Sequence, residues 1–334
     1  MKNSLDLSRI GIGLYQGEET DEVDHKLLSV LREAVNNGIN LFDSAPNYRN
    51  LRSEKILGEL VADNPLDKLI ISTKGGFIPF DFANPSLNEA DFINENYYSK
   101  GLIDPALFDE YYFQSFDPNY LEFQLSNSLS ALNRSYVDIY YIHNPEYLLQ
   151  RVGKKTFLKV MDDVFRWLEY KVQSNQIKFV GVSTWDGFFR VEQKEYLQLT
   201  DFIMLADRYH LLDRFKYIQF PFNFGKLNSV TEKSQVFKSQ NFSLLKLIDE
   251  FKLIAISSAP FGQGKLIHYK FPESIKLIYS NMNNAEINLS FVLSSSFFAS
   301  TLMGTSSLIH LNESISLWKD GNFNYDTFVK TFSL

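Results

Sequence analysis

Short apolar segments alternate with longer amphipathic segments along the whole chain, and this alternation constrains the fold more than any other feature. The eight apolar segments span residues 9–14, 40–44, 69–74, 137–143, 178–183, 217–222, 253–258 and 300–303. Between them, apolar residues recur at a helical period in 24–37, 53–62, 118–132, 155–175, 243–251 and 284–294. Continuous apolar strands indicate a parallel sheet covered by helices. Eight such alternations predict an α/β fold, a closed (β/α)8 TIM barrel, rather than an open sheet.

The barrel is predicted to form a single domain over residues 1–334. The chain is longer than the ~100–150 residues of an ordinary domain, but α/β barrels commonly reach or exceed ~250 residues. The alternative, a two-domain Rossmann protein, would need a glycine-rich turn between a strand and a helix. The nearest candidate, Gly11-Ile12-Gly13, lacks a third glycine and precedes an acidic loop. It therefore supports that alternative only weakly.

Composition and charge exclude several classes of protein. The formal net charge is −7, so no basic surface indicates binding to nucleic acid or to an anionic membrane. The chain has no cysteine, which excludes disulfides, thiolate–zinc sites and cysteine nucleophiles. The first residues lack the apolar core of a signal peptide, and no apolar run reaches the ~20 residues of a membrane helix. We therefore expect a cytoplasmic protein.

Four residues with acid–base chemistry fall at or just after consecutive predicted strands. Asp43 and Tyr48 follow the second strand, Lys74 ends the third and His143 ends the fourth. Catalytic groups of a TIM barrel lie at the carboxyl ends of its strands. Each residue alone is commonly structural, but four together on one rim predict an active site.

The motifs around these residues carry a family resemblance. Residues 38–48 read GINLFDSAPNY, and SEKILG at 53–58, ISTK at 71–74, VDIYYIH at 137–143 and GVST at 181–184 follow. Together they resemble the aldo-keto reductase family, from about residue 9 to about residue 314. The first three motifs are highly specific in combination.

The resemblance implies an NAD(P)(H)-dependent oxidoreductase that reduces an aldehyde or ketone to an alcohol. Tyr48 would donate the proton, Asp43 would hold Lys74, and His143 would hydrogen-bond the substrate oxygen. Hydride arriving at a carbonyl carbon leaves charge on the oxygen, which must be protonated. A free tyrosine, with a pKa near ~10, keeps its proton at neutral pH. We expect the Lys74 ammonium to lower that pKa and ease the transfer.

By the same resemblance, the cofactor residues lie at the remaining strand ends. Ser183, Thr184 and Gln219 match positions that hold the nicotinamide carboxamide, with Thr184 in place of the usual Asn. Ser258 stands where many members stack a tyrosine on the nicotinamide. The residues implied beside the ribose and along the pyrophosphate and adenosine-phosphate loops are Gly13, Leu14, Asp43, Ser258, Pro260, Phe261, Gly264, Gly304, Thr305, Ser306 and His310.

NADP(H) is the expected cofactor, with NAD(H) as its competitor. Family members that prefer NADP usually place Lys or Arg in the adenosine-phosphate loop. Here that loop offers His310, and a neutral imidazole holds a dianion more weakly than a guanidinium.

Two connections are much longer than the usual ~2–6 residues. Residues 192–215 have room for one helix and an extra turn. Residues 77–117 form an aromatic-rich insertion after the third strand, and we hypothesise that it is a lid that favours a bulky or aromatic carbonyl. The alternative is that its aromatic residues pack on the side of the barrel. The substrate site near the rim would be lined by Tyr15, Phe77 and Trp185.

Other functions stay open. The motifs resemble a long bacterial branch with few assigned substrates, and also sugar dehydrogenases of the L-galactose and threo-aldose type, which work in the oxidative direction. A barrel aldolase would use Lys74 as a Schiff-base nucleophile, although Asp43 and Tyr48 fit a reductase better. A metal-dependent hydrolase is disfavoured because His143 alone of five histidines lies on the rim, so no metal is expected. The remaining alternative is a non-catalytic, cofactor-binding regulatory subunit.

Overall fold

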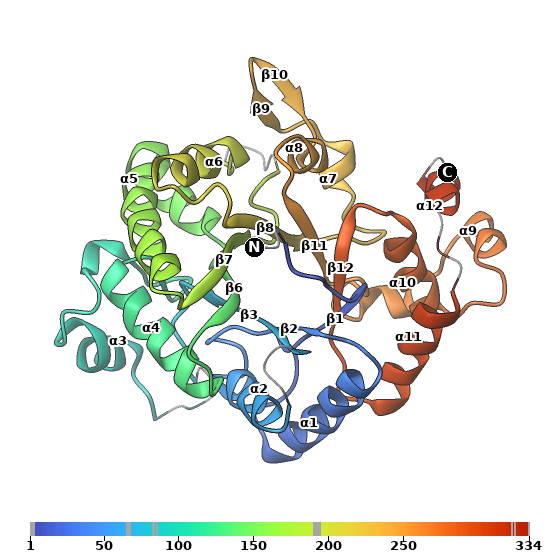
Figure 1. Cartoon of the computed structure of the whole chain (residues 1–334), viewed down its shortest axis with the longest axis horizontal. Coiled ribbons are helices and arrows are strands. Elements are labelled where there is room, and N and C mark those ends of the chain that lie inside the picture. The colour runs from blue at the N-terminus through green and yellow to red at the C-terminus, as the bar shows by residue number, and fades with distance from the viewer. Residues whose placement is uncertain are drawn as a thin grey trace.

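Eight parallel strands close into a barrel in the order β1-β12-β11-β8-β7-β6-β3-β2 (Figure 1). The computed structural model describes residues 4–64, 68–81, 84, 86–189, 195–321, 323 and 325–332. The barrel confirms the predicted fold, and each predicted strand boundary lies within two residues of the observed one. The strands are β1 (Ile10–Gly13), β2 (Leu41–Asp43), β3 (Ile70–Gly75), β6 (Val137–His143), β7 (Ile177–Ser183), β8 (Phe215–Pro221), β11 (Ile254–Ser258) and β12 (Phe298–Met303).

Helices surround the strands and bury their apolar outer faces (Figure 1). Their starts follow local capping chemistry, because a side-chain oxygen satisfies a free backbone N–H of the first turn. Thr20 caps the first of them and Asn283 forms a capping box with Glu286. The covering helices are α1 (Asp21–Asn36), α2 (Arg52–Ala62), α4 (Pro118–Ala131), α5 (Glu146–Gln173), α6 (Leu199–Arg208), α8 (Leu244–Glu250), α10 (Asn284–Ser294) and α11 (Leu308–Asp320).

Helix α5 begins nine residues before the predicted start at 155. Gly153 interrupts it with φ 74° and ψ 163°, outside the helical region. The predicted helix therefore matches the part of α5 after this break. The part before it was missed because its first residues directly follow a strand end and read as a loop.

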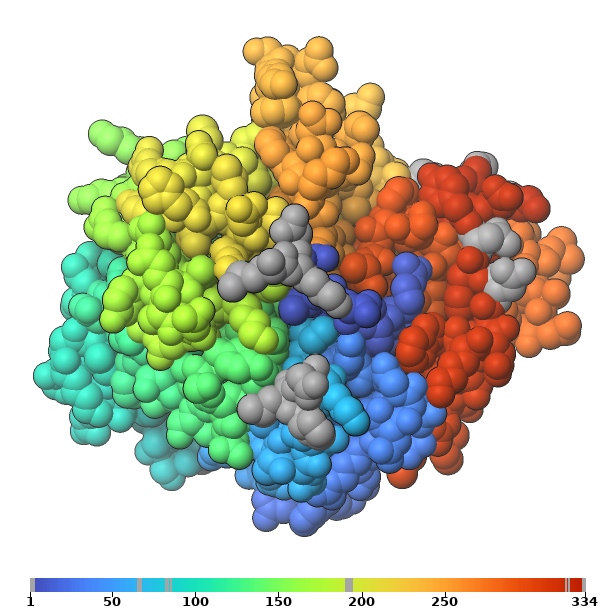
Figure 2. Space-filling view, in the orientation of Figure 1, coloured from blue at the N-terminus to red at the C-terminus, as the bar shows by residue number. Residues whose placement is uncertain are grey.

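Apolar side chains fill the barrel interior, while residues 4–8 lie across its amino-terminal end. The Leu5 amide donates to the Tyr217 hydroxyl at 3.0 Å, and Asn40 Nδ2 donates to the Asp6 carbonyl at 2.8 Å. Figure 2 shows this segment in dark blue at the centre of the face drawn. The interior cluster comprises Leu41, Ile70, Ile139, Tyr141, Phe179, Tyr217, Ile256 and Leu302.

The parallel register brings the predicted site residues to one rim. Asp43 on β2 pairs with Ser72 on β3, and Lys74 on β3 pairs with Tyr141 on β6. At the next two interfaces, His143 pairs with Ser183 and Ser183 pairs with Gln219. Polar residues from neighbouring strands thus meet at the carboxyl end of the barrel.

The insertion after β3 has its own secondary structure, which the sequence did not predict. It contains α3 (Glu89–Ile93), a π-helix η2 (Asn94–Tyr98), a 3-10 helix η3 (Pro105–Leu107) and a hairpin of β4 (Phe108–Asp109) and β5 (Gln114–Ser115). Tyr97 makes edge contacts with Tyr120 and Phe123 of α4. Phe80, Phe108 and Phe113 are buried among other insertion residues. Phe82 lies outside the described residues.

The connection between β8 and α8 carries a second unpredicted hairpin. The connection comprises α7 (Asn228–Thr231) and the hairpin of β9 (Gln235–Phe237) and β10 (Gln240–Phe242). The hairpin projects from the molecule in Figures 1 and 2. The long connection before β8 contains α6, the one helix expected there; residues 190–194 lie outside the described residues. Further elements are the 3-10 helix η4 (Lys265–His268), α9 (Glu273–Ile278) and α12 (Tyr325–Phe332). Within the described ranges, no helix has the length and apolarity needed to span a membrane.

Candidate active site

A cavity of about 540 Å³ opens at the carboxyl ends of the strands. Aromatic side chains form one side of it. The loop that follows β11 forms another side. The lining residues are Gly13, Tyr15, Gln16, Asp43, Asn47, Tyr48, Phe77, Tyr112, His143, Asn144, Tyr147, Ser183, Thr184, Trp185, Gln219, Ser258, Ala259, Pro260, Phe261, Gln263, Gly264, Leu302 and Gly304.

An ion pair lies beneath the cavity floor. Lys74 is fully buried, and its Nζ lies 2.5 Å from Asp43 Oδ2. The same Nζ donates to the Ser44 carbonyl at 2.8 Å. Burial lowers the pKa of Lys74, while the Asp43 carboxylate beside it acts in the opposite direction. Removing one partner would leave the other charge buried without compensation, so the two residues function as a unit.

The second carboxylate oxygen of Asp43 extends this unit across the floor. Asp43 Oδ1 accepts from Ser72 Oγ at 2.6 Å and from Gln219 Nε2 at 3.0 Å. The side-chain oxygen Oε1 of Gln219 in turn accepts from Ser183 Oγ at 2.6 Å. Residues from β2, β3, β7 and β8 therefore form one hydrogen-bonded network that fixes the rotamer of each member.

Tyr48 lines the cavity next to this ion pair. Lys74 Nζ is 4.7 Å from the centre of its ring, and the His143 ring centre is 5.8 Å away. We expected Lys74 to lower the pKa of Tyr48, but that pKa lies well above its usual value. Burial is the largest cause, followed by the negative charge of Asp43 and by Tyr15. The phenol therefore keeps its proton at neutral pH.

His143 is buried at the end of β6, beside Tyr48. Its ring meets Phe77 edge-on, with centres 4.7 Å apart. Burial, and then the Lys74 charge, hold its pKa well below the usual 6.5. The imidazole is therefore neutral at pH 7 and presents one N–H donor and one acceptor.

A model of the aldo/keto reductase family matches residues 9–221. The chain belongs to the aldo/keto reductase family. It is 24% identical over 323 residues to the uncharacterized oxidoreductase YqkF of Bacillus subtilis, across 94% of this chain and 88% of that protein. The NADH-specific methylglyoxal reductase of Escherichia coli is 25% identical, across 63% of this chain and 57% of its own length. The D-threo-aldose 1-dehydrogenase of a Pseudomonas species is 26% identical, across 57% and 53%.

Solved structures of the same family share the fold. The holo form of aldo-keto reductase AKR11C1 from Bacillus halodurans gives a TM-score of 0.65 at 16% identity, over 98% of this chain and 92% of that one. An aldo-keto reductase from Klebsiella pneumoniae in complex with NADPH gives 0.61 at 14%, over 94% and 86%. The family resemblance inferred from the motifs is thus confirmed.

Most of the cofactor residues predicted for this aldo/keto reductase line the cavity, and four do not. Leu14 is buried with its side chain in the core. Thr305, Ser306 and His310 lie at the start of α11, beyond the lining residue Gly304. The ten predicted residues that line it are Gly13, Asp43, Ser183, Thr184, Gln219, Ser258, Pro260, Phe261, Gly264 and Gly304.

The side of the cavity after β11 is formed by a loop that contains two glycines. Gly262 and Gly264 have φ angles of 55° and 87°, conformations that favour glycine, and their amides donate within the loop to the Ala259 and Phe261 carbonyls at 2.9 and 3.0 Å. A Cβ added to Gly304 would lie 3.2 Å from the Gly13 carbonyl oxygen, so β1 and β12 approach each other closely at this edge.

Thr184 lines the cavity, but its hydroxyl is already used inside its own loop. Its Oγ1 accepts from the Gly187 amide at 2.9 Å, and its hydroxyl bonds to the buried carboxyl of Glu146. Ser183 and Gln219 are likewise engaged, with each other and with Asp43.

The predicted substrate residues Tyr15, Phe77 and Trp185 all line the cavity, and two further aromatic residues join them. Tyr112 and Tyr147 stack in parallel, with ring centres 3.6 Å apart. Sequence reasoning missed Tyr147, which lies four residues after His143. Extending the search from each strand end into the first turn of the following helix would have found it. Tyr112 carries no such signal. The other lining residues that sequence reasoning missed are Gln16, Asn47, Asn144, Ala259, Gln263 and Leu302.

The insertion thus contributes to the site in a more limited way than a lid. Among its described residues, Phe77 and Tyr112 line the cavity. The aromatic residues around Phe80 and Tyr97 pack against one another and against α4 instead. The alternative that the aromatic residues pack on the side of the barrel therefore holds for this part of the insertion, and a selective lid stays a hypothesis.

Proposed function

We propose that this aldo/keto reductase reduces an aldehyde or ketone to an alcohol, with Tyr48 as the proton donor. The observation that carries the proposal is the position of Tyr48 on the cavity floor, next to the Lys74–Asp43 pair and beside His143. A reduced nicotinamide cofactor bound along the loop after β11 would supply the hydride.

The surrounding residues prepare the proton transfer. Tyr48 keeps its proton at neutral pH because its pKa is raised. Negative charge that develops on a carbonyl oxygen near the phenol would be stabilised by the buried Lys74 ammonium, since electrostatic interactions are strong in a site that excludes water. The neutral His143 would donate a hydrogen bond to the same oxygen and fix its direction. Lys74 in turn depends on Asp43 for its charge and position.

NADP(H) is our first choice of cofactor. A family member with this fold was solved with NADPH, whereas one relative is an NADH-specific reductase. His310 is exposed at the start of α11, so it can meet a 2′-phosphate but holds it weakly when neutral. Michaelis constants for NADPH and NADH measured side by side decide between the two cofactors.

Oxidation of an aldose is the second candidate. One relative is a D-threo-aldose 1-dehydrogenase. Amide side chains line the cavity beside the aromatic ones, namely Gln16, Asn47 and Asn144. Aromatic faces with amides near them suit a sugar ring, which presents apolar faces and hydroxyl edges.

A spectrophotometric screen tests both candidates. Aldehydes, ketones and aldoses are assayed with each cofactor in both oxidation states, and with Tyr48→Phe as the matched control. Turnover of carbonyls that is lost in Tyr48→Phe supports the proposal. Tight cofactor binding without turnover of any compound would instead indicate a regulatory subunit.

A further inference from the structure

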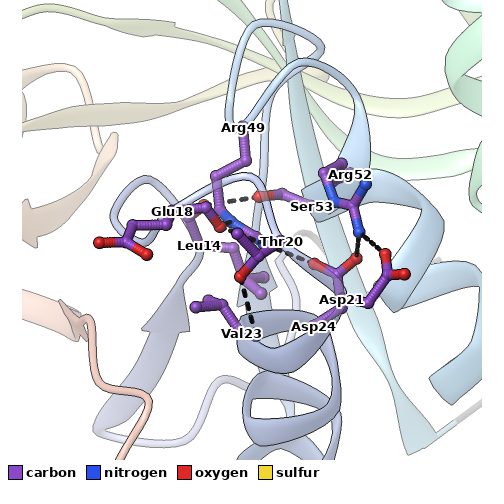
Figure 3. A network of polar contacts seen from close by, with 9 residues as sticks. All are labelled: Leu14, Glu18, Thr20, Asp21, Val23, Asp24, Arg49, Arg52 and Ser53. Carbon is purple, nitrogen blue, oxygen red and sulfur yellow. Dashed lines mark hydrogen bonds and ion pairs between the residues drawn. The ribbon is translucent and has the colours of Figure 1, made fainter.

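A charged network joins two loops of the rim on the side of the cavity where Tyr48 lies (Figure 3). The first loop, residues 14–20, runs from β1 to α1. The second, residues 44–51, runs from β2 to α2. Tyr15 and Gln16 of the first and Asn47 and Tyr48 of the second line the cavity. The rings of Tyr15 and Tyr48 contact each other edge-on, with centres 5.1 Å apart.

Arg49, the residue after Tyr48, reaches back to the first loop. Its side chain is only 1% exposed. Its Nε and Nη2 both donate to the Glu18 carbonyl, at 3.0 and 2.7 Å, and Nη2 also contacts Asp24 Oδ1 at 2.5 Å. A Cβ added to Gly17 would lie 3.3 Å from Arg49 Nε, so the guanidinium packs directly against the loop backbone.

Arg52 completes the network from the first turn of α2. Its Nη2 pairs with both Asp21 and Asp24 of α1. Asp24 therefore receives Arg49 on one carboxylate oxygen and Arg52 on the other. Figure 3 shows Arg49 of the second loop and Arg52 of α2 converging on this carboxylate.

The second loop has a backbone conformation that needs such support. Arg49, Asn50 and Leu51 have φ angles of 49°, 50° and 68°, a left-handed region that residues other than glycine seldom adopt. The Leu51 amide closes the turn on the Pro46 carbonyl at 2.8 Å. Three consecutive residues of this kind persist where surrounding contacts fix them.

The first loop is held at both ends. At its start, Ser53 Oγ donates to the Leu14 carbonyl at 2.8 Å, and the Leu14 amide donates to the Asp43 carbonyl at 3.0 Å. At its far end, Arg49 holds the Glu18 carbonyl. The residues between these two ties include Tyr15 and Gln16, which form part of the cavity wall.

From these contacts we infer that Arg49 is a positioning residue: its buried guanidinium locks the wall formed by Tyr15 and Gln16 against Tyr48 and so sets the direction of the Tyr48 hydroxyl. The inference rests on the proposed role of Tyr48. Arg49 acts through the backbone of the two loops, and its side chain is not among the residues that line the cavity.

The test compares Arg49→Met with a matched control, Arg32→Met. Arg32 pairs with Asp63 at 2.6 Å and likewise joins α1 to the region of α2, but this pair is exposed and does not touch either rim loop. Amide hydrogen exchange of residues 14–20 is measured together with kcat and KM. For Arg49→Met we expect faster exchange in this segment and a kcat lowered by roughly 10- to 100-fold, as a small misplacement of a reacting group causes. Arg32→Met should match the wild type in both.

Two milder variants should give intermediate changes in exchange and in kcat. They keep the test valid if Arg49→Met fails to fold. Asp24→Asn keeps both Arg49 bonds to the Glu18 carbonyl, so it should raise the exchange of residues 14–20 less than Arg49→Met. Arg49→Lys keeps the charge but cannot make all three bonds, so it should recover part of kcat. Wild-type exchange at 14–20 in Arg49→Met and Asp24→Asn, or equal losses in Arg32→Met, would overturn the inference.

Tyr48→Phe, assayed beside these variants, separates the two claims. If Tyr48→Phe loses turnover while Arg49→Met keeps a wild-type kcat, the positioning role is wrong and the proposed function stands. If Tyr48→Phe keeps its turnover, the proposed function is wrong, whatever the exchange of residues 14–20 shows.

Discussion

The floor of the cavity and its outer wall are built in different ways. Asp43, Lys74 and His143 lie on strands whose register is fixed by backbone hydrogen bonds on both sides. Tyr112 of the wall lies in the insertion, where its amide donates to Asp109 Oδ1 and its ring contacts Tyr111 and Tyr147. The floor therefore imposes the chemistry with little freedom, whereas the wall can change its side chains without disturbing the barrel. This difference predicts large effects on rate from floor substitutions and small, substrate-dependent effects from wall substitutions.

The largest effect should come from breaking the floor at Lys74. We expect Lys74→Met to lower kcat/KM by roughly 10²- to 10⁴-fold, because the ammonium near the reacting oxygen is lost. Asp43 would also be left buried and unpaired, which should lower the unfolding free energy by about 3–5 kcal/mol. Steady-state kinetics and urea unfolding measure the two effects. Adding Asp43→Asn to Lys74→Met should restore stability without restoring the rate. Normal activity in Lys74→Met would contradict the catalytic role that we give to the floor.

A second prediction concerns pH, through two buried glutamates beside the floor and the wall. Burial raises the pKa of Glu54 and of Glu146 to about 7 in the folded protein. Between pH 4.5 and about 7 the folded state therefore binds more protons than the unfolded state, so the unfolding free energy falls as pH rises through this window. Each group accounts for up to about 3 kcal/mol.

Urea unfolding at pH 5 and pH 8 checks this prediction. Glu54→Gln and Glu146→Gln should each flatten the decline in stability. Glu59→Gln serves as the matched control, because Glu59 is exposed on the same helix α2 as Glu54. A decline that is the same in the wild type and in both buried-site variants would show that other groups cause it.

The smallest effect should come from the wall. Tyr112→Ala removes a ring that lines the cavity and stacks on Tyr147. An aromatic contact of this kind contributes ~0.5–1.5 kcal/mol, so KM for a bulky carbonyl should rise roughly 2- to 10-fold while that for a small aldehyde stays unchanged. Its neighbour Tyr111 is 87% exposed, so Tyr111→Ala should leave both values unchanged. Equal changes in KM for both substrates would show that Tyr112 does not determine substrate specificity.

The same contrast explains what sequence reasoning predicted. Residues such as Asp43 and His143 were placed correctly because strand periodicity and the barrel rule fix both the strand and its carboxyl end. The insertion was recognised by its length and composition, but its hairpin and π-helix were not. Contacts such as Tyr97 with Tyr120 decide that packing, and they join residues with no regular spacing.

The pKa of Tyr48 shows a second limit of sequence reasoning. Proximity to Lys74 was predictable from the strand ends, and it suggested a lowered pKa. The structure gives the opposite direction, because Asp43 pairs with that ammonium while burial and the carboxylate charge act on the phenol. The balance among these effects depends on burial, which a motif does not encode.

The most direct test of the central claim is single-turnover hydride transfer in Tyr48→Phe compared with the wild type. Binding of the reduced cofactor is followed separately by its fluorescence. Our account predicts that the variant binds the cofactor within about two-fold of the wild type, while transfer to a carbonyl slows at least roughly 100-fold. Transfer at the wild-type rate with normal cofactor binding would contradict the claim that the Tyr48 hydroxyl supplies the proton.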